Sequence, residues 1–236
     1  MKISIIIPVY NESAIIEKNA CLISECLENN FEDYELIFSD DGSTDGSAGI
    51  LKGLNLPNCR IEESMKNMGK GHAVRSGMAV AKGDILIFTD ADLAYGTDAV
   101  LRMANALREG GADVVIGSRN IDDDGYSGYP KIRKRASKIY ISLLAWLFGL
   151  KHSDFQCGLK GFRKEAAERI FSNATVNGFA FDIELLLISD ALGIKTEELP
   201  VRIQIHVESK VSLIRDALKM LADLVKIKFR LKKTLR

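Results

Sequence analysis

Cysteine and histidine are scarce in this chain of 236 residues, which has four cysteines and three histidines. No two cysteines form a CxxC pair, so a structural zinc site is not indicated, and we expect reduced, mostly buried thiols in a cytosolic protein. The formal net charge is +0, which argues against a protein that binds nucleic acid by bulk attraction to phosphate. No internal repeat or low-complexity tract interrupts the chain.

Long apolar runs are also missing. None reaches the ~18 to 20 residues that a helix needs to cross a bilayer. The chain enters a predicted strand at Ile3, with no charged region followed by an apolar one, so we expect no signal peptide. Hydrophobic residues make up 47% of the sequence, enough for a substantial core. The length suits one large domain, or one domain with a tail.

Strand and helix patterns alternate through the first half of the chain. Apolar runs predict strands at residues 3–9, 34–39, 60–62, 85–89 and 113–116. Helical spacing predicts helices over residues 12–29, from Ser43 or Thr44 to about 54, after the loop 67–71, and around 100–107. This alternation predicts an α/β fold with a Rossmann-like, mostly parallel, doubly wound sheet, whose ligands bind at the carboxyl ends of the strands.

The second half carries two basic and apolar segments. Residues 131–138 contain five basic residues, and residues 139–150 are apolar except for Ser142 and Gly149. A helix of that length spans about 18 Å, too short to cross a bilayer, so it is either a buried core helix or a helix in the membrane interface. Residues 211–236 predict a long amphipathic helix with a basic end, after a buried helix led by residues 179–184 and a strand at 198–205. The two segments together favour attachment to a membrane surface.

Two carboxylates follow the strand in residues 84–92, DILIFTDAD. Asp90 and Asp92 are either a helix cap with a solvated neighbour or a site for a divalent metal that carries a phosphate ligand. The polar sequences at 40–46 (DDGSTDG) and 117–119 (GSR) also follow predicted strands. Because the carboxyl ends of parallel strands meet at one edge, this convergence favours the metal site.

The ordered set of motifs resembles the polyprenyl-phosphate sugar transferases of the GT-A fold, a group that includes the dolichyl-phosphate mannose and glucose synthases. The matching stretches are residues 7–12, 40–46, 67–75, 90–92, 117–119, 154–161, 181–186 and 209–210. Residues 154–158 and 179–186 look closer to the glucose branch, dolichyl-phosphate beta-glucosyltransferase. Gln204 stands where mannose synthases carry an arginine, which weakens the case for a mannosyl donor.

The resemblance implies a donor site and a metal. Asp90 and Asp92 would hold Mg²⁺ or Mn²⁺, with Asp92 as the direct ligand, because Ala94 cannot ligate a metal. The rest of the metal shell would come from phosphate and water. The residues implied in binding the nucleotide sugar are Pro8, Tyr10, Glu12, Asp40, Lys70, Asp90, Ala91 and Lys210.

The resemblance also implies an acceptor site, in which Arg119, Arg133 and Ser137 receive the phosphate of a polyprenyl lipid. Asp92, Arg119 and Arg133 would be the catalytic residues. The expected reaction is metal-dependent transfer of a hexose, glucose from UDP-glucose, to polyprenyl or dolichyl phosphate with inversion, by a protein peripheral on the cytoplasmic face of a membrane. The catalytic domain would span residues 1–210, with 131–150 as an interfacial segment and 211–236 as a C-terminal membrane-facing amphipathic helix.

Two alternatives stay open. A soluble inverting glycosyltransferase would act on a sugar hydroxyl with Asp182 as the base, and its activity would not need a phosphorylated polyprenol. A nucleotidyltransferase also places acidic pairs at the strand ends of a similar sheet, and it would release pyrophosphate rather than UDP.

Overall fold

The computed structural model describes residues 1–121, 145, 148–149, 151–204, 223–224 and 226–231. Arg133, Ser137 and Lys210 lie outside the described residues, as do nearly all of the predicted interfacial segment 131–150 and most of the segment 211–236.

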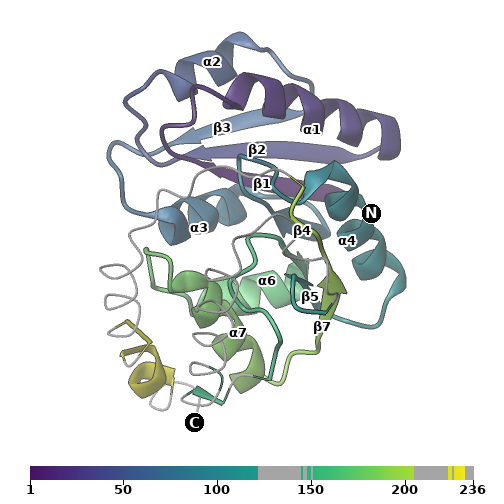
Figure 1. Ribbon diagram of the computed structural model, residues 1–236, viewed down its shortest axis with the longest axis vertical. Helices are drawn as coiled ribbons and strands as arrows, with labels where there is room; N and C mark the ends of the chain where they lie inside the picture. The colour runs from purple at the N-terminus through teal and green to yellow at the C-terminus, as the bar shows by residue number, and fades with distance from the viewer. Residues whose placement is uncertain (122–144, 146–147, 150, 205–222, 225, 232–236) are drawn as a thin grey trace.

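The described strands form one seven-stranded sheet in the order β3-β2-β1-β4-β6-β5-β7 (Figure 1). Every neighbouring pair is parallel except the two made by β6, which runs antiparallel between β4 and β5. The strands are β1 (Ile3–Val9), β2 (Tyr34–Asp40), β3 (Cys59–Glu63), β4 (Ile85–Phe88), β5 (Val114–Ser118), β6 (Lys160–Arg163) and β7 (Thr196–Pro200).

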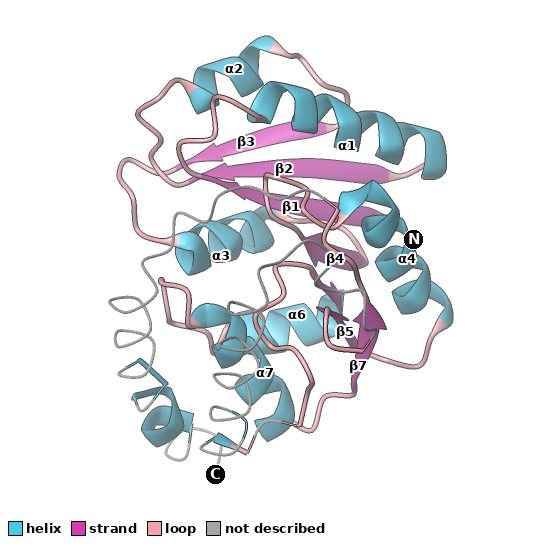
Figure 2. Ribbon diagram, viewed as in Figure 1, coloured by secondary structure: helices cyan, strands magenta, loops and turns pink. Residues whose placement is uncertain are grey.

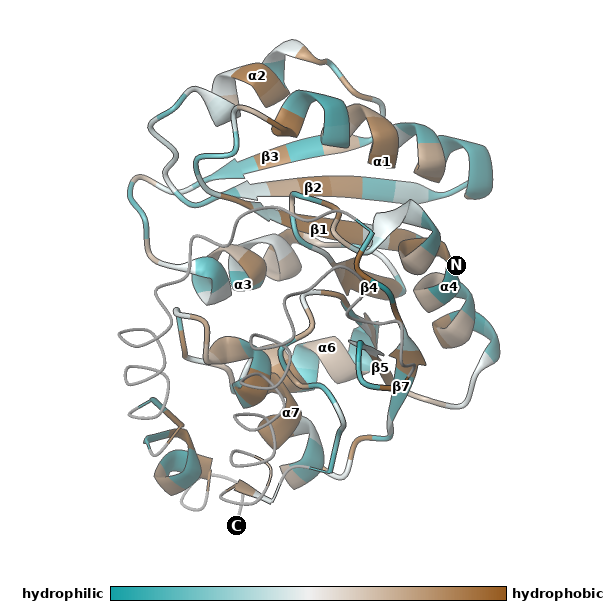
Figure 3. Ribbon diagram, viewed as in Figure 1, coloured by the Kyte–Doolittle hydropathy of each residue, from teal (hydrophilic) through white to brown (hydrophobic). Residues whose placement is uncertain are grey.

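Helices cover both faces of the sheet (Figure 2). The alternation of side chains along β1 explains this, because Ile3, Ile5 and Ile7 enter one apolar core and Ile6 enters the other. The first core packs under α1 (Ile16–Asn30), α2 (Ser47–Gly53) and α4 (Gly96–Glu109), and the second under α3 (Lys70–Val80), α6 (Lys164–Phe171) and α7 (Phe181–Ala191). The apolar residues concentrate in the strands between the two layers (Figure 3). The predicted doubly wound, mostly parallel sheet is therefore confirmed.

Strand direction brings the polar motifs to one edge of the sheet. β1 and β2 end level with each other, since Val9 pairs with Asp40. β4 runs parallel to β1, and β5 runs parallel to β4 because both oppose β6. The motifs 40–46, 90–92 and 117–119 therefore leave the sheet at the same edge, as the sequence predicted.

The first two helices begin later than predicted. α1 begins at Ile16 rather than at residue 12, because the preceding amides bind side chains of the next loop: Asn11 N–H to Ser43 Oγ, Glu12 N–H to Ser47 Oγ and Ser13 N–H to Asp45 Oδ2, each at 2.9 Å. α2 begins at Ser47, whose N–H donates to Asp45 Oδ1 at 3.0 Å, so neither Ser43 nor Thr44 caps it.

Two further expectations about the chain were wrong, and one strand and one helix were missed. The last predicted strand, 198–205, is β7 and ends at Pro200. β6 and α6 were not predicted at all. Of the four cysteines only Cys157 is buried, whereas Cys21 is exposed and Cys26 and Cys59 are partly exposed.

The described part of the C-terminal segment is helical at residues 223–224 and 226–231. Leu224 and Ile227 are buried against the second core, while Phe229 is 73% exposed. The apolar side of this segment therefore packs on the protein, and the opposite side faces solvent. Among the described residues, no helix combines the length and the apolar character needed to cross a membrane.

Candidate active site

The acidic pair lies in a tight turn that directly follows β4. Leu93 N–H donates to the carbonyl of Asp90 at 3.0 Å, and Leu93 itself has a φ of 47°. Ala91 is buried, and its carbonyl accepts a hydrogen bond from Asn19 Nδ2 on α1 at 2.8 Å. Asn19 was not predicted to have a role, yet it fixes the turn that carries both carboxylates.

Lys70, the first residue of α3, forms an ion pair with Asp90 Oδ1. Burial lowers the pKa of Lys70, but the charges of Asp90 and Asp182 raise it above its ordinary value, so the ammonium group stays charged. Gly158 lies against the other side of Asp90, where an added Cβ would come within 2.0 Å of Oδ2. The Asp90 carboxylate is thus held between an ammonium group and a backbone that has no room for a side chain.

Asp92 Oδ1 accepts a hydrogen bond from Ala94 N–H at 3.0 Å. Burial, and then the charge of Asp90, raise the pKa of Asp92 to about 6, and Glu12 adds to the shift. Asp90 and Glu12 thus both act on Asp92, and among the described residues Lys70 is the ammonium group that opposes them. A divalent cation would relieve this excess of negative charge.

The donor chemistry fits Mg²⁺ or Mn²⁺, because both prefer carboxylate oxygen. Asp90 already pairs with Lys70, which leaves Asp92 as the better ligand. Within the described residues no group of three or more His, Cys, Asp or Glu side chains could hold a metal ion. Phosphate and water would therefore have to complete the shell.

Asp40 ends β2 and is 3% exposed. Its Oδ2 accepts the N–H of Ser43 at 2.9 Å. Its Oδ1 is buried and has no hydrogen-bond partner among the described residues. A buried carboxylate oxygen left unpaired is costly, so this atom is a candidate acceptor for an N–H group of a ligand.

Asp41 positions the start of α3, a role that the sequence analysis missed. Its carboxylate accepts N–H groups from Met68 at 3.1 Å and from Gly69 at 2.6 Å. The next residue, Gly42, has a φ of 73°, and a Cβ there would lie 2.6 Å from the carbonyl carbon of Lys66. Asp41 therefore fixes the loop that delivers Lys70. The two consecutive acids followed by glycine were the available signal.

Three more of the predicted donor residues lie at the same edge, whereas Lys210 lies outside the described residues. Pro8 is in β1 opposite Ser39 of β2, and Tyr10 follows the strand with 41% of its surface exposed. Glu12 is half-buried and close enough to Asp92 to raise its pKa. The structure thus brings these three residues to the edge that carries Asp40, Lys70 and the acidic pair.

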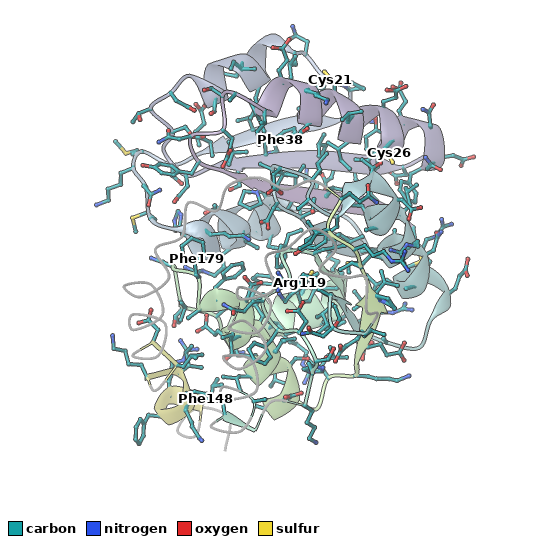
Figure 4. All side chains as sticks on the ribbon, in the orientation of Figure 1. Cys21, Cys26, Phe38, Arg119, Phe148 and Phe179 are labelled. Carbon is teal, nitrogen blue, oxygen red and sulfur yellow. The ribbon has the colours of Figure 1, made fainter. Side chains whose placement is uncertain are left out.

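Arg119 follows β5 near the middle of the molecule (Figure 4). Its Nε donates to Asp154 Oδ2 at 2.6 Å and its Nη2 to Oδ1 at 2.9 Å, and Asp154 is fully buried. Burial lowers the pKa of Arg119, but Tyr95 and Asp154 raise it, so the guanidinium stays charged. The Nε and Nη2 groups of Arg119 are therefore occupied by Asp154. Contact between Arg119 and an acceptor phosphate stays a prediction.

A second buried ion pair lies beneath Lys70 and was not predicted. Lys160 of β6 is fully buried, and its Nζ donates to the carbonyl of Cys157 at 2.6 Å and to Asp182 Oδ1 at 2.5 Å. Burial raises the pKa of Asp182, while Lys160 and Lys70 oppose that shift. Charges of alternating sign therefore run from Asp90 through Lys70 and Asp182 to Lys160.

The profile described as "Glycosyl transferase family 2" matches residues 4–171, more than half of the chain. The chain belongs to glycosyl transferase family 2. The site described above is thus the candidate active site of a glycosyltransferase.

Curated relatives of this family 2 glycosyltransferase include three informative proteins. Glycosyltransferase AglD of Haloferax volcanii is 30% identical over 93% of the chain, which spans 36% of AglD. The dolichyl-phosphate beta-glucosyltransferases of Drosophila melanogaster and Saccharomyces cerevisiae are both 32% identical, over 86% and 96% of the chain, which spans 67% and 74% of their lengths. The chain thus covers about a third of AglD and two thirds or more of the other two. The resemblance drawn from the motifs is confirmed.

Solved structures share the fold. Glucosyl-3-phosphoglycerate synthase from Mycobacterium tuberculosis, in complex with Mn²⁺, UDP and phosphoglyceric acid, aligns with a TM-score of 0.74 at 22% identity, over 96% of this chain and 78% of that one. The same synthase with Mg²⁺ and UDP aligns with a TM-score of 0.70 at 18% identity, over 96% and 79%. At these identities the likeness shows that this family 2 glycosyltransferase has a GT-A-like fold.

Proposed function

We propose that this glycosyltransferase transfers glucose from UDP-glucose to the phosphate of a polyprenyl or dolichyl lipid, with a divalent metal and with inversion. The observation that carries the proposal is the meeting of Asp92, Lys70 and Asp40 at one edge of the sheet. Oδ1 of Asp40 has no hydrogen-bond partner in the part of the chain that the structure describes. Binding of a nucleotide sugar requires a ligand for the metal, a cation for the diphosphate and a hydrogen-bond acceptor for the nucleobase. The two relatives named dolichyl-phosphate beta-glucosyltransferase are each 32% identical, over 86% and 96% of the chain. Their names support a lipid phosphate as the acceptor.

In the proposed donor complex, Oδ1 of Asp40 accepts the N–H group of the uracil ring, a charge-assisted hydrogen bond. Lys70 offers its ammonium group to the diphosphate in exchange for part of its contact with Asp90. A divalent ion held by Asp92 would neutralise the negative charge that develops on the leaving diphosphate. Pro8, Tyr10, Glu12 and Lys210 would complete the contacts to the nucleotide sugar.

The reaction needs no strong base. An oxygen of the lipid phosphate attacks the anomeric carbon, the bond from that carbon to the diphosphate breaks, and UDP leaves with the electron pair. A phosphate monoester has a second pKa of about 6, so near pH 7 the nucleophile is already mostly dianionic.

The environment of Asp182 supports a phosphate acceptor over a sugar hydroxyl. Asp182 is 5% exposed, and its Oδ1 accepts the hydrogen bond from Lys160. A base that must take a proton from a hydroxyl needs access to it, and a buried carboxylate paired with an ammonium group is a poor candidate.

The acceptor side rests on the family resemblance. Arg119, Arg133 and Ser137 would hold the lipid phosphate, since arginine makes bidentate contacts with phosphate oxygens. We place the protein on the cytoplasmic face of a membrane, where a lipid phosphate and a nucleotide sugar meet.

The test is to incubate the protein with Mg²⁺ or Mn²⁺, a polyprenyl phosphate and a panel of nucleotide sugars, and to identify the products by mass. With UDP-glucose as the donor, the expected products are glucosyl polyprenyl phosphate and UDP. In a parallel incubation with UTP and glucose 1-phosphate, release of pyrophosphate would instead identify a nucleotidyltransferase. Transfer to a free sugar without any lipid phosphate would identify the hydroxyl-acceptor alternative.

A further inference from the structure

We infer that the protein docks on an anionic lipid surface through residues 64–72, 173–181 and 226–231, which we name the basic rim. The inference rests on the proposed function, because it names the surface from which the lipid acceptor reaches the site. All three segments are among the described residues, and none of them includes the segment 131–138.

The basic rim exposes large apolar side chains. Met65 is fully exposed at 104%, Met68 is 39% exposed, Phe179 is 43% exposed and Phe229 is 73% exposed. Single exposed apolar residues are ordinary on a protein surface, but several on adjoining segments mark a site of interaction.

Hydrogen bonds tie the three segments together. Gly71 N–H donates to the carbonyl of Asn177 at 2.8 Å, which joins the first segment to the second. Arg230 hydrogen-bonds Thr175 Oγ1 and pairs with the buried Glu184 at 2.5 Å, which joins the third segment to the second. Phe179 lies beside the N-terminal end of α3 in Figure 4, and residues 226–231 lie below it in Figure 1.

The charge of the basic rim is one-sided. The three segments contain five Lys or Arg residues and no Asp or Glu, in a protein with 32 basic and 32 acidic residues. Lys70 and Arg230 are paired with Asp90 and Glu184. The other three, Lys66, Lys226 and Lys228, are exposed to solvent. Lys226 lies 3.5 Å from Asp223, and Lys228 Nζ lies 5.4 Å from the centre of the Phe148 ring. Such a surface complements anionic headgroups.

Methionine and phenylalanine tips between lysines suit a bilayer surface. The apolar tips can enter the boundary of headgroups and acyl chains while the ammonium groups stay among the headgroups. The first segment contains Lys70, which pairs with Asp90, so the basic rim borders the donor site. The phosphate of a lipid acceptor in a bilayer bound at the basic rim would therefore lie beside the candidate active site.

The test is co-sedimentation of the purified chain with vesicles of phosphatidylcholine, with and without phosphatidylserine. We expect binding that needs phosphatidylserine. Lys66→Glu, and the double variant Met65→Ser with Phe179→Ser, should each weaken that binding about tenfold. Lys18→Glu and Leu22→Ser change an exposed lysine and an exposed leucine on α1, and these controls should bind like the parent.

A second measurement separates this inference from the proposed function. Glucosyl transfer to a water-soluble, short-chain polyprenyl phosphate is assayed without vesicles. The basic-rim variants should keep that activity, because none of the changed side chains contacts the acidic pair. Equal vesicle binding by the basic-rim variants and the α1 controls, or binding indifferent to phosphatidylserine, would overturn the basic rim. Absence of transfer in every protein, with the binding differences intact, would overturn only the proposed reaction.

Discussion

Lys160 Nζ donates a hydrogen bond to Asp182 Oδ1 at 2.5 Å, and the lysine is fully buried. The ammonium group also lies 5.6 Å from the centre of the Phe88 ring, which contributes a further favourable contact. Neither charge could stay in this apolar layer without the other. The pair thus fixes β6 against α7 directly beneath Lys70.

Removing one partner of this pair should be costly. We expect Lys160→Met to lower the free energy of unfolding by about 3 to 5 kcal/mol, because the Asp182 carboxylate would be left buried and unpaired. Urea denaturation measures this, and adding Asp182→Asn should restore much of the loss. The control is Lys195→Met, which removes a 3.0 Å pair with Glu197 whose side chains are 60% and 52% exposed, and which should cost less than about 1 kcal/mol. Equal losses of unfolding free energy in Lys160→Met and Lys195→Met would contradict the structural role of the buried ion pair.

Asp92→Asn should abolish nearly all glucosyl transfer while leaving the fold intact. Burial already disfavours the charge of Asp92, so loss of that charge should not lower the melting temperature. Transfer activity and Mn²⁺ binding by calorimetry are the measurements. Asp98→Asn on α4, where the carboxylate is 72% exposed, is the matched control and should change neither. Full activity in Asp92→Asn would rule out the metal role.

Asp40→Asn should weaken binding of UDP about 10- to 100-fold. The amide would place an NH₂ group or a weaker acceptor where Oδ1 now stands, and a hydrogen bond to a charged group contributes about 1.5 to 3 kcal/mol. Isothermal titration with UDP gives the affinity, and Asp33→Asn, at an exposed position, is the control. Unchanged affinity for UDP in Asp40→Asn would show that this oxygen does not meet the base.

Gly158→Ala should disturb Asp90 and lower transfer activity more than stability. Its methyl group would lie 2.0 Å from Oδ2 of Asp90, which Lys70 holds from the other side, so the carboxylate must move. Gly49→Ala in α2 meets no atom within 4 Å and is the control. Steady-state kinetics should show loss in Gly158→Ala alone, and parent-like activity there would show that the position of Asp90 is not critical.

Stability should fall on the alkaline side through His152. Contacts with Asp190 and Glu198 raise the pKa of His152 to about 9. A group whose pKa is raised in the folded state stabilises the fold fully below its unfolded pKa of about 6.5. This stabilisation is lost as pH rises through 9. Thermal melts from pH 6 to pH 10 should show the decline, and His152→Gln should flatten it.

Stability should also fall at acidic pH, because Glu198 loses its charge there. Burial raises the pKa of Glu198, but bonds from His152 and Ser153 lower it to about 2. This contribution is therefore present above pH 4.5 or so and is lost as pH falls toward 2. Melts of Glu198→Gln should depend less on pH in this range than melts of the parent.

The strands of the first half could be predicted because they are continuous apolar runs covered on both faces. β6 could not be predicted, because its sequence KGFR has only one apolar side chain. Its lysine can be buried only because it pairs with Asp182 of α7, a contact that the local sequence does not reveal. The last strand was placed too far along the chain because Val201 and Ile203 are apolar and buried, although β7 ends at Pro200. Val201 N–H still donates to the carbonyl of Ser118 at the end of β5 at 3.0 Å, and Ile203 packs on the core beyond it.

The same limit applies to the site. Asp40, Lys70, Asp90 and Asp92 were predicted from motifs, and the structure brings them to one edge. Asn19 and Asp41 were missed because their task is to hold backbone atoms of Ala91, Met68 and Gly69, and single residues leave no periodic trace of such contacts.

The segment 154–158, which precedes β6, touches both halves of the site. Its first residue, Asp154, binds Arg119, and its last, Gly158, lies against Asp90. Five residues thus set the separation of the Asp90 carboxylate and the Arg119 guanidinium, the groups that we propose for the donor and the acceptor. We expect that exchanging this segment between relatives changes the size of the acceptor group that fits between them, with Asp90 and Arg119 left unchanged.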